Sequence, residues 1–256
     1  MKSLKEPFLT VVKIILVFVL FSSCATGPKY SQISLSSLKG QVVRSLQDRE
    51  KIGKSLRGSA SFRWSGQKQA EILLLVKRPL DFRFDVVSDF GYYLQQAVSL
   101  SGLFTVIWYE ENRYFRGVGT SEQVGRYLSI KLTPREVVSF LLGSPPIEEE
   151  ENYELFPLRK RDYFILRGER SEITVRKMGT EYLPVKYRAL DIGGEALYSI
   201  EYDDYSEDSL FPYRIRGRFR GKRIEIAFEE VELNPSLPRD LFEIEIPEGA
   251  DRIYDD

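Results

Sequence analysis

Most of this chain consists of short segments in which apolar and polar residues alternate. In the first of them, Ala60, Phe62 and Trp64 alternate with serine and arginine, and Gly66 follows as a turn. A period of two gives a strand one apolar and one solvated side, as in antiparallel sheets. The same pattern predicts strands at 56–65, 70–76, 81–86, 92–100, 103–109, 113–116, 162–167, 171–177, 182–190, 195–202, 211–219 and 222–233.

Three segments have a helical pattern instead. Apolar residues recur at helical spacing over 32–52, which predicts an amphipathic helix there. Two capping boxes, Thr120 with Gln123 and Thr133 with Glu136, predict helices in the middle of the chain. Gly143 and the prolines behind it end the second of these. The chain is therefore expected to be mainly β (α+β), with helices inserted between two groups of strands.

The N-terminus has the pattern of a secretory signal. Basic residues precede an apolar run and small residues, and Cys24 follows as the only cysteine. We therefore expect residues 1–23 to be a lipoprotein signal peptide, and residues 24–31 to be a lipidated cysteine with a short tether. The alternatives are a membrane-spanning helix and a cleaved signal with an incidental cysteine. The run is interrupted by Lys13 and is shorter than the roughly 20 residues that a span needs.

Composition removes several classes of function. The chain has no histidine, which excludes Ser-His-Asp and Cys-His catalysis and histidine-ligated zinc. Its 37 basic and 38 acidic residues nearly balance, so the chain has no net positive charge that would attract nucleic acid. No cofactor or metal is expected apart from covalent lipid on Cys24. Because no segment is long enough to be a linker between domains, residues 32–256 are expected to form a single domain and a monomer.

A run of arginines alternates with apolar residues along 213–220. Arg214, Arg216, Arg218 and Arg220 would share one face of that strand. Such a face is either a polyanion site or one side of cross-strand ion pairs with Glu225 and Glu229. Ion pairing is the simpler interpretation.

The order of elements and three short motifs resemble the family of the outer-membrane lipoprotein receptor LolB and its periplasmic partner LolA. The stretch from Gly58 to Trp64 resembles the opening strand of LolB, and 88–91 lies where LolB has a protruding loop. Residues 121–145 resemble its helix-loop-helix, ending at Leu142-Gly-Ser-Pro145. The resemblance is carried by residues 55–146.

The resemblance implies a curved, incomplete antiparallel β-barrel with a helical lid, anchored on the periplasmic face of the bacterial outer membrane. Its apolar cavity would receive the acyl chains of lipoprotein cargo from a LolA-like carrier and release them into that membrane, without catalysis. Aromatic and aliphatic residues on the expected inner face are candidates for the lining: Phe62, Trp64, Leu74, Phe84 and Trp108. For any one of them, an ordinary packed core is the simpler interpretation, because aromatic stripes usually pack.

The loop around Phe90 carries the sharper hypothesis. Gly91 permits a tight turn, and Tyr92 adds a further aromatic ring. By resemblance, Phe90 occupies the place of a leucine that LolB needs to pass cargo into the membrane. We expect Phe90, Gly91 and Tyr92 to contact the bilayer or the acyl chain, the alternative being that Phe90 folds back onto the sheet.

Three other interpretations remain open. The same scaffold would serve a module that binds another lipid or a glycolipid during envelope assembly. An enzyme is disfavoured because no pair of Asp or Glu residues lies in a sequence context that indicates an active site. A purely structural lipoprotein would have a filled interior, with no cavity beneath its helices.

Overall fold

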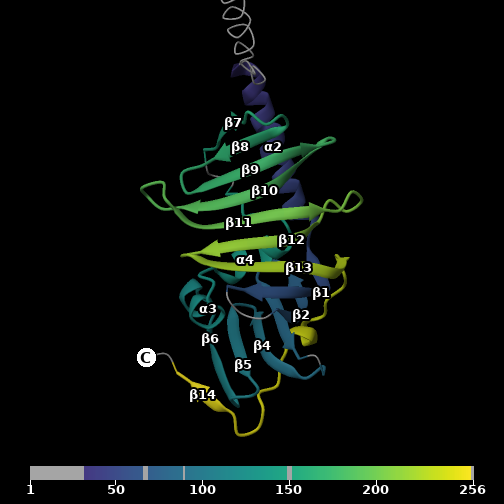
Figure 1. Cartoon of the computed structure of the whole chain (residues 1–256), viewed down its shortest axis with the longest axis vertical. Coiled ribbons are helices and arrows are strands. Elements are labelled where there is room, and N and C mark those ends of the chain that lie inside the picture. Colours follow the sequence, from purple (N-terminus) through teal and green to yellow (C-terminus); the bar gives the residue numbers. More distant parts are fainter. Residues whose placement is uncertain (1–31, 66–68, 89, 149–151, 255–256) are drawn as a thin grey trace, which may run out of the picture.

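All the strands in the described chain belong to one sheet (Figure 1). The computed structural model describes residues 32–65, 69–88, 90–148 and 152–254. The expected signal peptide, Cys24 and the tether therefore lie outside the described residues. The sheet has 14 strands, in the order β14-β6-β5-β4-β3-β2-β1-β13-β12-β11-β10-β9-β8-β7.

The first half of the sheet consists of β1 (Ser55–Trp64), β2 (Ala70–Lys77), β3 (Asp81–Val87), β4 (Tyr93–Leu100), β5 (Leu103–Trp108) and β6 (Arg113–Val118). The second half consists of β7 (Glu154–Pro157), β8 (Tyr163–Arg167), β9 (Ser171–Met178), β10 (Glu181–Leu190), β11 (Ala196–Tyr205), β12 (Pro212–Phe219) and β13 (Lys222–Leu233). The helices within the described residues are α2 (Gln32–Ile52), α3 (Ser121–Leu128), α4 (Pro134–Leu141) and the 3-10 helix η1 (Arg239–Phe242).

Each half of the sheet is a meander of antiparallel neighbours. The two halves join where β1 pairs with β13, so strands that are far apart in sequence complete one surface. The short strand β14 (Asp251–Ile253) runs parallel to β6 at the end of the sheet. The strands turn from across the view in the upper half to along it in the lower half (Figure 1). The expected open, curved, mainly antiparallel sheet with helices is confirmed.

One face of the sheet carries the main core. Helix α2 packs on β7 and β10, α3 on β5, and α4 on β2 and β3. Val42 and Leu46 of α2 join the same buried cluster as Val138 of α4 and the inward residues of both halves of the sheet. The helices therefore cover the concave face, and their apolar stripes are the reason they fold there.

The C-terminal segment covers part of the opposite face. Leu237 and Phe242 are buried there against Val98 of β4, in a second and smaller apolar cluster. This cover explains why Val98, on the outer side of its strand, is apolar.

Arg78 is one of the residues that connect the helices to the sheet. Arg78, in the β2–β3 turn, donates from Nε to the Gly53 carbonyl oxygen at 2.8 Å. Its other nitrogens donate to Ser139 Oγ in α4 at 3.1 Å and to Ser144 Oγ at 2.6 Å. Burial lowers the pKa of Arg78, while Glu50, 3.4 Å away, raises it. Arg78 thus connects α2, the sheet and the end of α4.

Two short strands were not predicted. β7 has four residues and β14 has three, and neither is long enough to show an alternating pattern. The expected helix over 32–52 agrees with α2.

Candidate functional site

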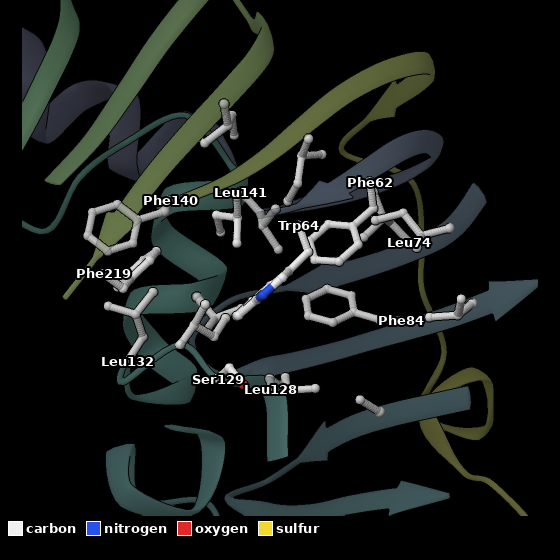
Figure 2. A pocket seen from close by; sticks show the side chains of 18 of the residues that line it. Phe62, Trp64, Leu74, Phe84, Leu128, Ser129, Leu132, Phe140, Leu141 and Phe219 are labelled. Atoms are coloured by element: carbon white, nitrogen blue, oxygen red, sulfur yellow. The ribbon is translucent and has the colours of Figure 1, made fainter. Parts of the chain in front are cut away.

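An apolar cavity of about 280 Å³ lies between the concave face of the sheet and the α3–α4 segment (Figure 2). Among its lining residues Gln95 and Ser129 are polar, and Trp64 and Tyr127 each carry one polar atom on an aromatic side chain. The lining residues other than Gln95 and Ser129 are Phe62, Trp64, Ile72, Leu74, Phe84, Val86, Ala97, Tyr127, Leu128, Ile130, Leu132, Val137, Phe140, Leu141, Ile200, Ile215, Phe219, Ile224 and Ile226. A structural protein with a filled interior would not have this space beneath its helices.

The cavity has a closed end and an accessible end. Leu74, Ala97 and Ile200 are almost completely buried in its depth. Phe62, Trp64 and Phe84 are only half-buried, so solvent reaches the cavity on their side. Figure 2 shows these three rings on the sheet, with Phe140 and Leu141 of α4 on the other side of the space. An apolar chain could enter past the rings and lie under α4.

Four of the five residues expected to line a cavity do so in the structure: Phe62, Trp64, Leu74 and Phe84. Trp108 does not belong to the lining. Its half-buried ring packs on Tyr127 of α3, with 5.6 Å between ring centroids, and Tyr127 itself faces the cavity. Trp108 therefore supports the wall from behind.

Much of the lining was not anticipated from the sequence. Ile215 and Phe219 come from β12, and Ile224 and Ile226 from β13. Their alternation predicted inward positions, but the cavity needs the pairing of β1 with β13 to bring them beside Phe62 and Trp64. The last residue of α3, Leu128, and the loop after it contribute further lining residues: Ser129, Ile130 and Leu132.

Helix α4 is fixed over the cavity by its first turn. Thr133 Oγ1 accepts from Glu136 N at 3.2 Å, and Glu136 Oε2 accepts from Thr133 N at 2.7 Å, the predicted capping box. The second oxygen, Oε1, accepts from the Tyr198 hydroxyl of β11 at 2.6 Å. Burial, with the nearby Tyr187 and Glu136, raises the pKa of Tyr198, so the phenol stays a donor.

The Phe90 loop leaves the sheet next to the cavity. Val86 and Gln95, paired across β3 and β4 just before this loop, both line the cavity. Gly91 has a φ of 80°, and its N–H donates to the Ser88 carbonyl oxygen at 2.8 Å, which closes a tight turn.

The aromatic side chains of this loop face solvent. Phe90 is 87% exposed and Tyr92 is 73% exposed. Phe90 does not fold back onto the sheet, so the loop presents an apolar tip beside the cavity.

The arginine face of β12 is partly paired. Arg214 Nε lies 2.8 Å from Asp204 Oδ2, and its Nη1 lies 3.6 Å from Glu225 Oε1. Arg216 pairs with Asp203 of β11. Ion pairing therefore accounts for this half of the face, although Asp203 and Asp204 are the main partners rather than the expected Glu229.

Neither a metal centre nor a membrane-spanning helix is found in the part of the chain that the structure describes. Within it, no group of three Asp, Glu, Cys or His side chains is arranged to hold a metal ion. None of the described helices combines the length and the apolar character needed to cross a bilayer.

Comparison with solved structures identifies the fold. The LolA superfamily protein NE2245 from Nitrosomonas europaea aligns with a TM-score of 0.53 at 12% identity, over 79% of this chain and 97% of that one. A domain from Vibrio parahaemolyticus, described as an outer membrane lipoprotein-sorting protein, aligns with a TM-score of 0.55 at 10% identity, over 80% and 97%.

A DUF1329 family protein from Desulfovibrio piger aligns with a TM-score of 0.54 at 14% identity, over 82% of this chain and 97% of that one. No protein-family model and no curated protein matches the sequence. The chain therefore has a LolA-like fold, with structural neighbours of low sequence identity.

Proposed function

We propose that this protein is a membrane-anchored lipoprotein-binding protein that works as LolB does. It receives lipoproteins, holds their acyl chains in the apolar cavity and inserts them into the outer membrane. The observation that carries the proposal is the juxtaposition of that cavity with the exposed Phe90 loop. The LolA-like fold supports it, since an apolar space under helices is what an acyl carrier requires.

The cavity supplies binding energy without specific polar contacts. Each buried methylene contributes about 0.8 kcal/mol, so a few methylenes hold a chain while leaving it free to depart. Most of the lining is aliphatic or aromatic, and its polar groups are confined to Gln95, Ser129, the Trp64 N–H and the Tyr127 hydroxyl, so the site suits hydrocarbon. The function proposed is thus binding and transfer, without catalysis.

The Phe90 loop would provide the exit. A large exposed aromatic side chain on a protruding turn can enter the interfacial region of a bilayer. Since Val86 and Gln95 connect the loop directly to the cavity wall, an acyl chain leaving past them would meet the membrane at Phe90. The expected lipid on Cys24 would keep this exit near the bilayer, and a LolA-like carrier would deliver the cargo.

A transfer assay tests the proposal. Radiolabelled lipoprotein bound to a periplasmic carrier is mixed with the full-length protein in outer-membrane vesicles, and its arrival in the membrane is followed. Phe90→Glu should slow insertion by at least tenfold, because a carboxylate at the tip resists entry into hydrocarbon. The matched control is Val118→Glu, which replaces a 71% exposed residue at the end of the strands opposite the Phe90 loop.

A folded Phe90→Glu protein that inserts lipoprotein at the normal rate would contradict the proposed exit. Mass spectrometry of ligand retained by the gently purified protein tests the cargo itself. Triacylated lipoprotein supports the receptor function, whereas a glycolipid or another lipid would assign the same cavity to envelope assembly.

A further inference from the structure

The hairpin between β12 and β13 concentrates positive charge at its tip. Residues 218–223 read Arg-Phe-Arg-Gly-Lys-Arg, with four cations and no acidic residue, in a chain whose net charge is −1. Arg220 and Gly221 form the turn, with φ of 46° and 84°. Positive φ at both positions is what a tight two-residue hairpin requires. The charge is therefore a local feature, held on a rigid hairpin.

Ion pairing does not account for these four cations. Among the described residues, no carboxylate lies within ion-pairing distance of Arg218, Arg220, Lys222 or Arg223. Arg218 and Arg223 face each other directly across the two strands. Like charges in that position destabilise a sheet. Arg218 does contribute to lowering the pKa of Glu201, but within the described residues none of the four cations has a close ion pair like those of Arg214 and Arg216 in the same strand.

Lys222 lies at the mouth of the cavity. It pairs with Phe219 and lies two residues before Ile224, so it is on the inner face of the sheet with these two lining residues. Its Nζ lies over the ring of Trp64, 5.6 Å from the centroid. Trp64 and Phe219 line the same cavity in Figure 2. The aromatic contact holds an exposed ammonium group beside the half-buried rings of the entrance.

An amphiphile bound in this cavity would have its polar end at that ammonium group. The depth of the cavity accepts only hydrocarbon, so the head group has to remain near the entrance. There it would lie beside Lys222, which has no carboxylate partner among the described residues. A charge-assisted hydrogen bond from Lys222 is the strongest contact that the entrance offers.

We propose that the cavity also binds anionic amphiphiles, whose carboxylate or phosphate contacts Lys222 at the entrance while the acyl chain fills the space behind Trp64. This inference rests on the proposed function in one respect, namely that the cavity holds an acyl chain. It goes beyond that function by adding a second class of ligand, since the lipid of an acylated cysteine carries neither a carboxylate nor a phosphate, and by assigning a residue that determines specificity.

Trp64 provides the readout. The full chain carrying Trp108→Phe is reconstituted in bilayers of neutral lipid, so that Trp64 is the only tryptophan. It is titrated at pH 8 with a fatty acid brominated along its chain, and separately with the brominated alcohol of equal length, and quenching reports binding. A lysophosphatidic acid of the same chain length distinguishes phosphate from carboxylate as the preferred head group.

The fatty acid should bind about tenfold more tightly than the alcohol, as expected for a hydrogen bond to a charged group. Lys222→Met should remove that advantage and leave the alcohol unchanged. Raising the salt concentration should also reduce the advantage. The matched control is Arg216→Met, which removes a cation from the outer face of β12, where Arg216 pairs with Asp203.

Equal affinity for acid and alcohol, or an equal loss of both in Lys222→Met, would overturn the inference while leaving the acyl cavity intact. Failure of every ligand to quench Trp64 would contradict the proposed function and the inference together.

Discussion

The hydroxyl of Tyr198 donates a 2.6 Å hydrogen bond to Glu136 Oε1 and so joins β11 of the sheet to the first turn of α4. The other oxygen of Glu136 completes the capping box with Thr133. One carboxylate therefore fixes both the start of α4 and its attachment over the cavity. The ring of Tyr198 also stacks on Phe219, a lining residue, at 5.5 Å between centroids.

Replacing Tyr198 by Phe should loosen this attachment without creating a void. The rings stay packed and the hydrogen bond to a charged acceptor is lost, so we expect a loss of about 1.5–3 kcal/mol in the free energy of unfolding. Urea unfolding measures this directly. Tyr213→Phe is the control, because the Tyr213 hydroxyl has no hydrogen-bond partner among the described residues, and it should change stability by less than about 0.5 kcal/mol. Equal stability of both variants would show that the bond does not hold the lid.

Two glycines should respond in opposite directions to alanine. At Gly58, in the bulged pairing of β1 with β13, a Cβ would lie 2.2 Å from the Glu230 carbonyl oxygen. Gly58→Ala should therefore cost about 1–3 kcal/mol of stability, because the join between the two halves of the sheet must open.

Gly40, inside α2, would place a Cβ in open space. Gly40→Ala should stabilise the protein by about 0.5–1 kcal/mol, since alanine favours helix. Thermal and urea unfolding of the two variants compare them directly. A neutral Gly58→Ala would indicate that β13 can shift away from β1.

A buried carboxylate should make stability depend on pH. Glu172 is buried, which by itself raises its pKa, but hydrogen bonds from Arg167 and Arg188 prevail and lower it below its usual range. A lowered pKa in the folded state gives stability that is complete above the unfolded pKa of about 4.3 and is lost as the pH falls through the folded value.

Glu172→Gln should therefore be clearly less stable than the natural protein at pH 7, and the gap should close as the pH falls below about 4. Glu154→Gln, at an exposed position of β7, should show no such gap. Urea unfolding across this range provides the test, and a gap that persists unchanged at pH 3 would assign the effect to packing instead of charge.

The alternation of residues was sufficient to predict the long strands, because each has one buried and one solvated side. It could not predict β7 and β14, which are too short to show a period. The prediction for Trp108 fails for a different reason. Periodicity gives the side of the strand, whereas α3 decides which inward rings face the cavity and which pack behind Tyr127.

The cavity itself depends on long-range pairing. Phe62 and Trp64 were predicted as lining residues from their own strand, yet Ile224 and Ile226 reach them only because β13 pairs with β1 across most of the chain. Likewise, the alternation placed four arginines on one face of 213–220, but it did not single out Lys222, and the register was needed to place that residue beside Trp64.

Binding to the cavity should follow the length of the acyl chain. Each added methylene should raise the affinity about fourfold, from roughly 0.8 kcal/mol of burial, until the space is filled. Isothermal titration with saturated fatty acids of increasing length tests this. An affinity that does not change with chain length would mean that the chain is not buried.

The most direct test of an acyl-binding cavity is to fill it. Ala97 is buried in the lining, and Ala97→Phe places a ring where the chain would lie; Ala196→Phe makes the same change at an exposed position of β11. Quenching of Trp64 by a brominated fatty acid is then measured in each protein, with Trp108→Phe as background. We predict saturable quenching in the parent and in Ala196→Phe, and an affinity at least about tenfold weaker in a folded Ala97→Phe. Unchanged binding in Ala97→Phe, or no saturable quenching in the parent, would contradict the account.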